Sequence, residues 1–362
     1  MKRIVVLGAS GSIGLHTIRC IEDFPDLFTL AGFSVAKNKD VALQLSRQFP
    51  QAKVLEGPIE DIEKNIEPFL LACNADIAVN GISGAAGLKA SIACIHVGLD
   101  LALANKESIV LAGHLLRSDA KKKDLHIIPV DSEHSALFCL INAFGAQTVE
   151  RLILTASGGP FRTLAREQFS QITVEAALKH PNWKMGGKIS IDSSTLANKA
   201  LEVIEAVQLF DVPTERITVV VHPESIVHSL IQLHSHQIYG QMSIPDMRFP
   251  ILYALCYPNA ACPYLSPLDF SKAFSLTFEP PRYDDFPLLK MGFDVAKAGA
   301  GYPIAFNAAN EVAVQAFLEG RCTFVEIPLL VEKVLQADWS STISEYSQVF
   351  ALDKKARAMC IF

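Results

Sequence analysis

Three carboxylates in this sequence are placed where they could hold a divalent cation. Asp131 and Glu133 directly follow an apolar stretch, residues 127–130, that is expected to form a buried strand. Glu202 lies further along, in a segment with helical periodicity. Carboxylate oxygens suit Mg²⁺ or Mn²⁺ better than zinc, so the three residues predict such a site. Alone, the Asp131 and Glu133 pair could equally be a helix start, with Asp131 as the N-cap. His134 is expected to pack behind the site.

The segment 180–205 concentrates groups that suit a phosphate. Asp192 or Ser193 is expected to cap a helix whose apolar stripe falls at positions 196, 200, 203 and 207. A helix start favours an anion because its first backbone N–H groups are free. Hydroxyls, an amide and an ammonium surround this start: Ser193, Ser194, Thr195, Asn198 and Lys199. The phasing places Asn198, Glu202 and Glu205 on one face, which could otherwise be an ordinary solvated face.

A glycine-rich turn near residue 8 has the context of a dinucleotide site. Residues 4–7 form an apolar, β-branched strand, and Gly8, Gly11 and Gly14 follow at intervals of three before a helix that begins near residue 15. Such glycines permit a tight turn and a close backbone approach to a pyrophosphate at the helix start. A plain tight turn is the alternative, but a strand followed by glycines and a helix favours cofactor binding.

The end of the second strand, residues 28–35, indicates which dinucleotide is bound. NAD enzymes usually carry an acidic residue there for the ribose 2′-hydroxyl. Here Lys37 and Asn38 stand at the tip, and a lysine suits the additional phosphate of NADP. Asp40 is expected to cap the following helix. The sequence therefore predicts NADP(H).

Other strand ends carry polar groups as well. A second glycine-rich turn, residues 80–87, follows a strand at 77–79, and the triplet Asn105, Lys106 and Glu107 follows a strand at 101–104. In a doubly wound sheet these ends line the cofactor crevice, so Lys106 is expected near the nicotinamide and substrate. Ser157, followed by two glycines after a strand at 152–154, predicts a small anion-binding nest, with a plain turn as the alternative.

The order of the elements predicts an α/β protein with several domains. A Rossmann-like, doubly wound parallel sheet is expected over residues 1–130, the NADPH-binding domain. A catalytic metal- and substrate-binding α/β domain with a mixed sheet is expected over 131–256, and a proline-rich linker over 257–284. Helical periodicity from 285 to 362 predicts a C-terminal bundle with helices at 288–297, 304–318, 327–334 and 343–359.

Composition narrows the class of protein. The chain has 362 residues, half of them hydrophobic, and a net charge of −6, which argues against nucleic-acid binding. Neither a signal peptide nor the run of about 20 apolar residues that a membrane helix needs is expected. The eight cysteines are scattered without a CxxC pair, as in reduced core residues, so a cytoplasmic location is predicted.

Several motifs together resemble one family. The sequence is similar to the 1-deoxy-D-xylulose 5-phosphate reductoisomerases, NADPH-dependent enzymes of the methylerythritol phosphate route to isoprenoids. The motifs that carry this resemblance run from end to end: residues 8–14, Ala104-Asn-Lys-Glu-Ser108, Pro129-Val-Asp-Ser-Glu-His134, Ser157-Gly-Gly-Pro-Phe161, His180-Pro-Asn-Trp-Lys-Met-Gly186, Asp192-Ser193, Asn198-Lys199-x-Leu-Glu202, His222-Pro-Glu-Ser225 and Asn307-Ala-Ala-Asn-Glu311.

The resemblance implies a role for each group of residues. It implies retro-aldol cleavage and rejoining of the ketose phosphate, then reduction to 2-C-methyl-D-erythritol 4-phosphate, in a homodimer. Residues 180–186 would form a flexible lid, with Trp183 closing over the substrate and excluding water. The catalytic residues are expected to be Lys106, Glu133, His180 and Glu202, and the metal ligands Asp131, Glu133 and Glu202. The cofactor residues are expected to be Gly8, Ala9, Ser10, Gly11, Ser12, Ile13, Lys37, Asn38, Asn105, Glu107 and Gly186. The substrate residues are expected to be Lys106, Ser132, Glu133, Ser157, His180, Trp183, Ser193, Asn198, Lys199 and Glu202.

Two other functions fit part of the pattern. A metal-assisted NADP-dependent dehydrogenase of a simple sugar or polyol phosphate would use the same cofactor turn, cation and phosphate groups. A dinucleotide-sensing regulator would keep the fold, but it has no use for three carboxylates that repel one another without a cation. The lid motif favours the reductoisomerase over both.

Overall fold

The chain folds into two compact units. A computed structural model describes residues 1–179, 186–259 and 265–360, so residues 180–185 of the lid predicted at 180–186 lie outside the described residues. The first unit comprises Met1–Ser108, Leu116–Phe138 and Asp246–Ser266. The second comprises Ile109–Leu115, Cys139–Pro245 and Pro267–Phe362.

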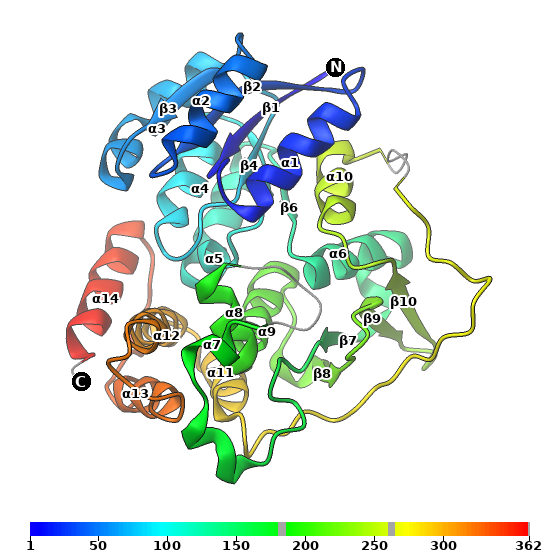
Figure 1. Ribbon diagram of the computed structural model, residues 1–362, viewed down its shortest axis with the longest axis vertical. Helices are drawn as coiled ribbons and strands as arrows, with labels where there is room; N and C mark the ends of the chain where they lie inside the picture. The colour runs from blue at the N-terminus through cyan, green and yellow to red at the C-terminus, as the bar shows by residue number, and fades with distance from the viewer. Residues whose placement is uncertain (180–185, 260–264, 361–362) are drawn as a thin grey trace. The chain divides into compact units, whose positions relative to one another are not determined.

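The first unit is built on a six-stranded parallel sheet. Its strands are β1 (Lys2–Leu7), β2 (Phe28–Val35), β3 (Lys53–Glu56), β4 (Ile77–Asn80), β5 (Asp100–Leu103) and β6 (Ile127–Pro129). They are ordered β3-β2-β1-β4-β5-β6 (Figure 1). The order reverses between β1 and β4, as in a doubly wound dinucleotide-binding sheet. Helices cover both faces of the sheet, so Ile4, Val5 and Val6 are fully buried. Strands buried on both faces are apolar at successive positions and do not alternate with polar residues. The predicted parallel sheet is confirmed.

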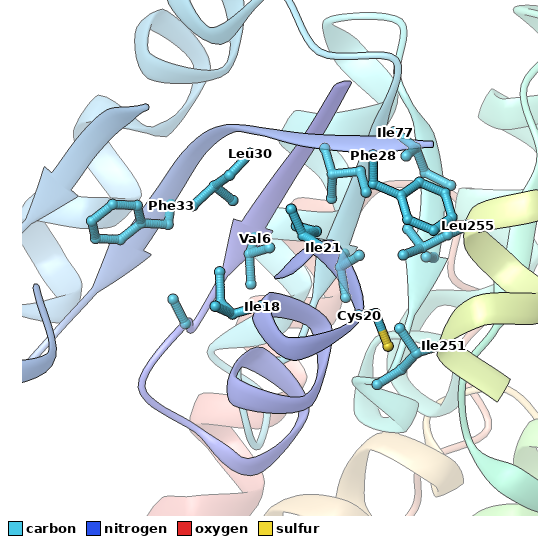
Figure 2. Packing of buried hydrophobic residues seen from close by; sticks show 14 of the residues in the cluster. Val6, Ile18, Cys20, Ile21, Phe28, Leu30, Phe33, Ile77, Ile251 and Leu255 are labelled. Atoms are coloured by element: carbon cyan, nitrogen blue, oxygen red, sulfur yellow. The ribbon is translucent and has the colours of Figure 1, made fainter. Parts of the chain in front are cut away.

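The helices of this unit connect the strands and close its core. They are α1 (Ser12–Asp23), α2 (Lys39–Gln48), α3 (Ile59–Cys73), α4 (Gly87–His96) and α10 (Arg248–Cys256). Two more, α5 (Lys106–Lys122) and α6 (Ser132–Phe144), begin at the ends of β5 and β6. Figure 2 shows Ile251 and Leu255 of α10 within the cluster that contains Cys20 and Phe28. Helix α10, which the predicted division assigns to the catalytic domain, therefore packs on the first unit.

The second unit contains a mixed sheet of four strands. These are β7 (Val149–Ala156), β8 (Ile217–Val221), β9 (Val227–Leu233) and β10 (Ile238–Met242), in the order β10-β9-β7-β8. β7 and β8 are parallel, whereas β7 with β9 and β9 with β10 are antiparallel. The period-two pattern of the last two strands is that of a half-exposed antiparallel ribbon. The predicted mixed sheet is confirmed.

The other regular elements of the second unit are helices and short 3₁₀ turns. Short 3₁₀ turns lie at Ala146–Thr148, Arg166–Gln171 and Thr214–Arg216. The helices are α7 (Val174–Ala177), α8 (Gly187–Ser194), α9 (Ala197–Phe210), α11 (Pro287–Ala298), α12 (Tyr302–Leu318), α13 (Glu326–Leu335) and α14 (Tyr346–Met359). The last four match the predicted C-terminal helices to within three residues, because their apolar stripes face a common core.

Two local expectations are wrong. The helix expected to start at Asp192 or Ser193 is instead two helices, and both residues lie in the last turn of α8. Leu196 has a left-handed backbone (φ 59°), which interrupts the helical ladder before α9. The N-cap of α2 is Asn38, whose side chain accepts from the Val41 N–H at 3.2 Å, whereas Asp40 lies in the first turn.

The cysteines and the helix lengths agree with the composition. The seven described cysteines are free thiols, and burial raises the pKa of Cys20 to about 12, as in an unreactive core residue. Within the described residues, the search for a helix with the length and apolarity of a membrane span found none.

Helices α9 and α11 approach so closely that only glycine fits at their contact. A Cβ atom at Gly292 of α11 would lie 2.5 Å from Cβ and 2.7 Å from Cα of Ala200 in α9. Because α9 also carries Lys199 and Glu202, this contact supports the segment that bears the predicted phosphate and metal residues.

We predict that Gly292→Ala destabilises the protein. Alanine normally stabilises a helix by about 1 kcal/mol relative to glycine. Here overpacking against a backbone atom should reverse the sign and lower the free energy of unfolding by about 1–3 kcal/mol. Urea unfolding measures the change, with Lys290→Ala, an exposed position on the same helix, as the control. A stabilised Gly292→Ala variant would show that the two helices can separate without cost.

Candidate active site

The glycine turn after β1 is shaped for close backbone packing. A Cβ atom at Gly14 would lie 2.4 Å from the Gly8 carbonyl oxygen, so no larger residue fits there. The Gly8 N–H donates to Ser34 Oγ at 3.0 Å, which holds the turn against the end of β2. Gly11 occupies the N-cap of α1 and provides no side-chain cap. The first N–H groups of α1 are therefore left without a capping side chain, as a pyrophosphate site requires.

The predicted cofactor residues of this turn are not equivalent. Ala9 is fully buried, so it can contribute only backbone, whereas Gly11 and Ser12 are exposed. Lys37 and Asn38 are exposed at the tip of β2, where the predicted adenosine phosphate would lie.

Asn105 links the second glycine turn to the start of α5. Its Nδ2 donates to the Gly84 carbonyl and to Glu107 Oε2, both at 2.9 Å, and its Oδ1 accepts from the Ser108 N–H at 3.0 Å. Asn105 thus acts as the N-cap of α5 and orients Glu107. Lys106 is buried at the same helix start, which directs its ammonium along the ends of the strands.

Lys106 and Asp131 form a buried ion pair at the ends of β5 and β6. Asp131 stands at the N-cap position of α6, where its carbonyl accepts from the Ser135 N–H at 2.8 Å. Its carboxylate lies within 4.8 Å of the Glu133 carboxylate, which in turn accepts from the Ser132 hydroxyl. Asp131 and Glu133 can therefore serve both as a helix start and as an acidic cluster, because the backbone caps the helix while the side chains form the cluster.

The charges around Asp131 keep it ionised. Burial disfavours the carboxylate, but the ammonium of Lys106 and, next, His134 outweigh it and hold the pKa of Asp131 well below its usual range. His134 is itself fully buried, and a ring nitrogen lies within 4.8 Å of the Asp131 carboxylate. An ionised aspartate next to a second carboxylate is a suitable ligand set for a hard cation.

In the second unit, Glu202 is the centre of a buried polar cluster. It is fully buried on α9, forms an ion pair with Lys199, and accepts from Asn198 Nδ2 at 2.5 Å. Lys199 also donates to the carbonyl of Thr155 at the end of β7. The predicted substrate residues Asn198 and Lys199 and the predicted metal ligand Glu202 thus share one face of α9.

The turn after β7 lies against the last turn of α8. Gly158 and Gly159 have positive φ angles, and the Gly159 N–H donates to Ser157 Oγ at 3.3 Å. A Cβ atom at Gly159 would lie 2.7 Å from the Ser193 carbonyl oxygen. This contact, which only glycine allows, brings the segments of Ser157 and Ser193 together, as the predicted phosphate site requires.

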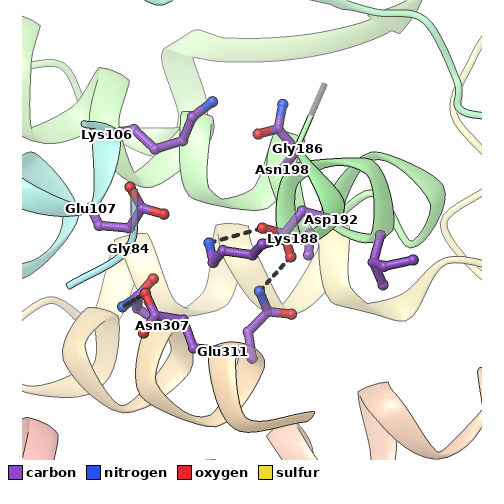
Figure 3. A network of polar contacts seen from close by, with 12 residues as sticks. Gly84, Lys106, Glu107, Gly186, Lys188, Asp192, Asn198, Asn307 and Glu311 are labelled. Carbon is purple, nitrogen blue, oxygen red and sulfur yellow. Dashed lines mark hydrogen bonds and ion pairs between the residues drawn. The ribbon is translucent and has the colours of Figure 1, made fainter. Parts of the chain in front are cut away.

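The structure gives Asp192 a role other than the predicted helix cap. Asp192 is buried, and its carboxylate accepts from Lys188 at 2.9 Å and from Asn310 at 2.7 Å (Figure 3). Asn307, Asn310 and Glu311 share one face of the helix predicted at 304–318, and the sequence predicts that this face docks against the other domains. The i to i+4 spacing of Lys188 and Asp192 is the available signal for their pairing. His180 and Trp183 lie outside the described residues, and Gly186 is the N-cap of α8.

The fold and these groups together define the class of protein. A doubly wound sheet with a glycine turn, joined to a unit with a buried lysine and carboxylate cluster, is typical of a dinucleotide-dependent oxidoreductase.

Comparisons with known proteins place the chain within this class. The model of 1-deoxy-D-xylulose 5-phosphate reductoisomerase matches residues 4–65 and 59–113, and models of the family's C-terminal domains match residues 127–210 and 242–359. The chain belongs to the 1-deoxy-D-xylulose 5-phosphate reductoisomerase family.

Individual relatives cover the whole chain. The reductoisomerase of Treponema pallidum (strain Nichols) is 52% identical over 363 residues, which are 99% of this chain and 96% of that protein. A crystal structure of DOX-P reductoisomerase in complex with NADPH, fosmidomycin and magnesium is 33% identical, with a TM-score of 0.90 over 99% of this chain and 97% of the other. The Zymomonas mobilis enzyme in complex with NADPH is 36% identical, with a TM-score of 0.87 over 99% and 98% of the two chains.

These findings confirm the resemblance, the α/β fold class and the prediction of a reductoisomerase. The roles of the individual residues stay predictions. The structure groups Lys106, Asp131 and Glu133 within the first unit. It groups the following predicted residues within the second: Ser157, Ser193, Asn198, Lys199 and Glu202.

We predict that Lys199→Met lowers the free energy of unfolding by about 3–5 kcal/mol, because it leaves the buried Glu202 without its ammonium. The double variant Lys199→Met/Glu202→Gln should lose less than the single variant, since no buried charge then lacks a partner. Urea unfolding at neutral pH measures both. The control is Lys179→Met, which breaks the exposed pair with Glu175 and should leave the free energy of unfolding nearly unchanged. Equal losses of free energy in the single and double variants would contradict the expectation that the unpaired Glu202 carboxylate causes the loss.

Proposed function

We propose that this chain converts 1-deoxy-D-xylulose 5-phosphate into 2-C-methyl-D-erythritol 4-phosphate, with NADPH as reductant and Mg²⁺ or Mn²⁺ as the divalent cation. The observation that carries the proposal is the buried cluster of Asn198, Lys199 and Glu202, in a chain that belongs to the reductoisomerase family. When bound, NADPH supplies the hydride, and the cation acts as a Lewis acid that stabilises negative charge on the substrate oxygens.

The residues of the first glycine turn fit a dinucleotide. The tight packing of Gly14 on Gly8 lets the backbone approach a pyrophosphate closely, and the uncapped start of α1 offers N–H donors to it. Exposed Lys37 supplies a positive charge for the 2′-phosphate that distinguishes NADPH from NADH. Asn105 and Glu107, at the start of α5, and Gly186, at the N-cap of α8, are further cofactor residues in this proposal.

The donor chemistry fits a hard cation. Asp131, Glu133 and Glu202 offer carboxylate oxygens, and the low pKa of Asp131 keeps one ligand ionised at neutral pH. Lys106 neutralises Asp131 when no other cation is near. Its Nζ–H groups can also hold a proton close to the substrate oxygens, and Ser132 orients Glu133 through its hydroxyl.

The substrate phosphate binds in the second unit. Ser157 and Ser193 offer hydroxyls from two segments that the Gly159 contact holds together, and Asn198 and Lys199 offer an amide and an ammonium from α9. The charge and the number of donors match a phosphate dianion. The family resemblance assigns a lid role to His180 and Trp183, which lie outside the described residues.

The wider context is also proposed. The enzyme is a homodimer in the cytoplasm, supported by the family resemblance and by the free thiols of the described cysteines. The division into an NADPH-binding domain (1–130), a catalytic domain (131–256), a linker (257–284) and a helical domain (285–362) remains a prediction. Manganese is an alternative to magnesium because both prefer oxygen ligands.

We predict that the purified protein oxidises NADPH with 1-deoxy-D-xylulose 5-phosphate only when a divalent cation is present. EDTA should abolish the decrease in absorbance of NADPH, and an excess of Mg²⁺ or Mn²⁺ should restore it. The product should be a branched methylerythritol phosphate, identified by NMR. Cation-independent oxidation would contradict the proposed metal chemistry, and an unbranched product would indicate a simple sugar-phosphate dehydrogenase.

We predict that Glu202→Gln lowers kcat by at least about 100-fold while leaving the Kd for NADPH within twofold, because the substitution removes the negative charge of a proposed metal ligand with little change in side-chain size. Turnover assays and NADPH fluorescence titration measure the two quantities. Glu215→Gln, an exposed carboxylate of the same unit, is the control and should change neither. A selective loss of NADPH affinity would place Glu202 in the cofactor site.

A further inference from the structure

The Asp192 carboxylate is held by two donors on separate oxygens. Lys188 Nζ donates to Oδ2 at 2.9 Å, and Asn310 Nδ2 donates to Oδ1 at 2.7 Å. The Asp192 side chain is 2% exposed, so both oxygens depend on these protein donors for most of their hydrogen bonding. With one donor on each oxygen, the plane of the carboxylate is defined, and with it the last turn of α8.

The two donors differ in what they can position. Lys188 lies one turn earlier on α8 itself, and its side chain is 24% exposed, so its bond ties the helix only to itself. Asn310 belongs to α12 and lies 118 residues further along the chain. Its bond is therefore the one of the two that fixes the end of α8 relative to another element.

Asn310 is not explained by stability alone. It is fully buried, and its Oδ1 accepts no hydrogen bond from the described part of the chain. A buried polar atom without a hydrogen bond destabilises the fold, and an apolar residue at this position would avoid that loss. The hydrogen bond that the structure assigns to Asn310 is the donation to Asp192. A buried amide kept for one long-range bond suggests that the position of Asp192 matters to function.

What Asp192 positions is its neighbour, Ser193. The last turn of α8 is tied together by its own hydroxyls, because Thr195 Oγ1 donates to the Asp192 carbonyl at 3.3 Å and Ser194 Oγ to the Ile191 carbonyl at 2.8 Å. The Ser193 carbonyl packs on Gly159. A shift of Asp192 would therefore move Ser193 relative to the turn that carries Ser157.

We propose that Asn310 is a positioning residue for substrate binding: through Asp192 it holds the Ser193 hydroxyl at the geometry that binds the phosphate of the substrate. The proposal rests on the proposed function, in which Ser193 contacts that phosphate. It gives the helix α12 of the C-terminal segment a direct part in substrate recognition. A displacement of about 1 Å in a binding group can lower activity up to about 100-fold. A small shift of Ser193 after loss of the Asn310 bond would therefore have a measurable effect.

The test compares three changes at this contact. Asn310→Leu removes the donor with little change in volume, and Asn310→Asp places a second carboxylate against Asp192. The double variant Asp192→Asn/Asn310→Asp exchanges the two groups, so that an amide at position 192 accepts from Lys188 and donates to the carboxylate at position 310. For each variant we would measure the KM for 1-deoxy-D-xylulose 5-phosphate, the KM for NADPH and the midpoint of thermal unfolding, with Mg²⁺ present.

We expect both single variants to raise the KM for the phosphosugar at least fivefold, with the KM for NADPH unchanged within twofold. The exchange should restore the phosphosugar KM to within twofold of the unsubstituted protein. Gln315→Leu, which replaces an exposed amide on the same helix, should change no KM. If Asn310→Leu does not fold, the aspartate variant and the exchange carry the test.

Two outcomes would overturn the proposal. A lower unfolding midpoint with an unchanged phosphosugar KM would mean that Asn310 only stabilises the fold, and an exchange that fails to restore the KM of Asn310→Asp would mean that the bond to Asp192 is not responsible. Ser193→Ala separates this inference from the proposed function. If Ser193→Ala leaves the phosphosugar KM unchanged, the phosphate assignment itself fails; if it raises that KM and the Asn310 variants do not, only the positioning role fails.

Discussion

The burial of Lys199 and Glu202 on one face of α9 constrains the rest of the second unit. A buried ammonium and a buried carboxylate are stable only with partners, and here each is the other's partner. Lys199 also donates to the carbonyl of Thr155, which fixes α9 to the end of β7. This one bond relates the helix that bears the predicted metal and phosphate residues to the strand that leads into Ser157. The geometry of the site thus follows from satisfying one buried charge pair.

Close backbone contacts through glycine then set the remaining positions. Gly159 allows the turn after β7 to touch the end of α8, and Gly292 allows α11 to lie directly on α9. In the first unit, Gly14 packs on Gly8 and leaves the start of α1 open. In each case a side chain is missing where the backbone itself must be close, which explains why glycines accompany the hydroxyls and carboxylates at strand ends.

The C-terminal helices are part of the site's support. Asn310 of α12 reaches Asp192, and α11 packs on the same helix that carries Glu202. The motif Asn307-Ala-Ala-Asn-Glu311 has a polar face that the sequence predicts to dock against the other domains, and one of its residues, Asn310, contacts Asp192. The buried Oδ1 of Asn310 accepts no hydrogen bond from the described residues and so destabilises the fold, and the residue next to Asp192 is Ser193.

The sequence by itself determined the parallel sheet, the mixed sheet, the four C-terminal helices, the acidic pair at Asp131 and Glu133, and the family, because each depends on local periodicity, strand ends or motif spacing. It did not reveal the break at Leu196, since leucine rarely adopts a left-handed backbone and the apolar stripe continues across it. Nor did it reveal that Asp192 ends a helix and pairs with Asn310. Only the tertiary structure decided these points, because a hydrogen bond between residues 118 positions apart depends on how the helices pack, and no local pattern encodes that.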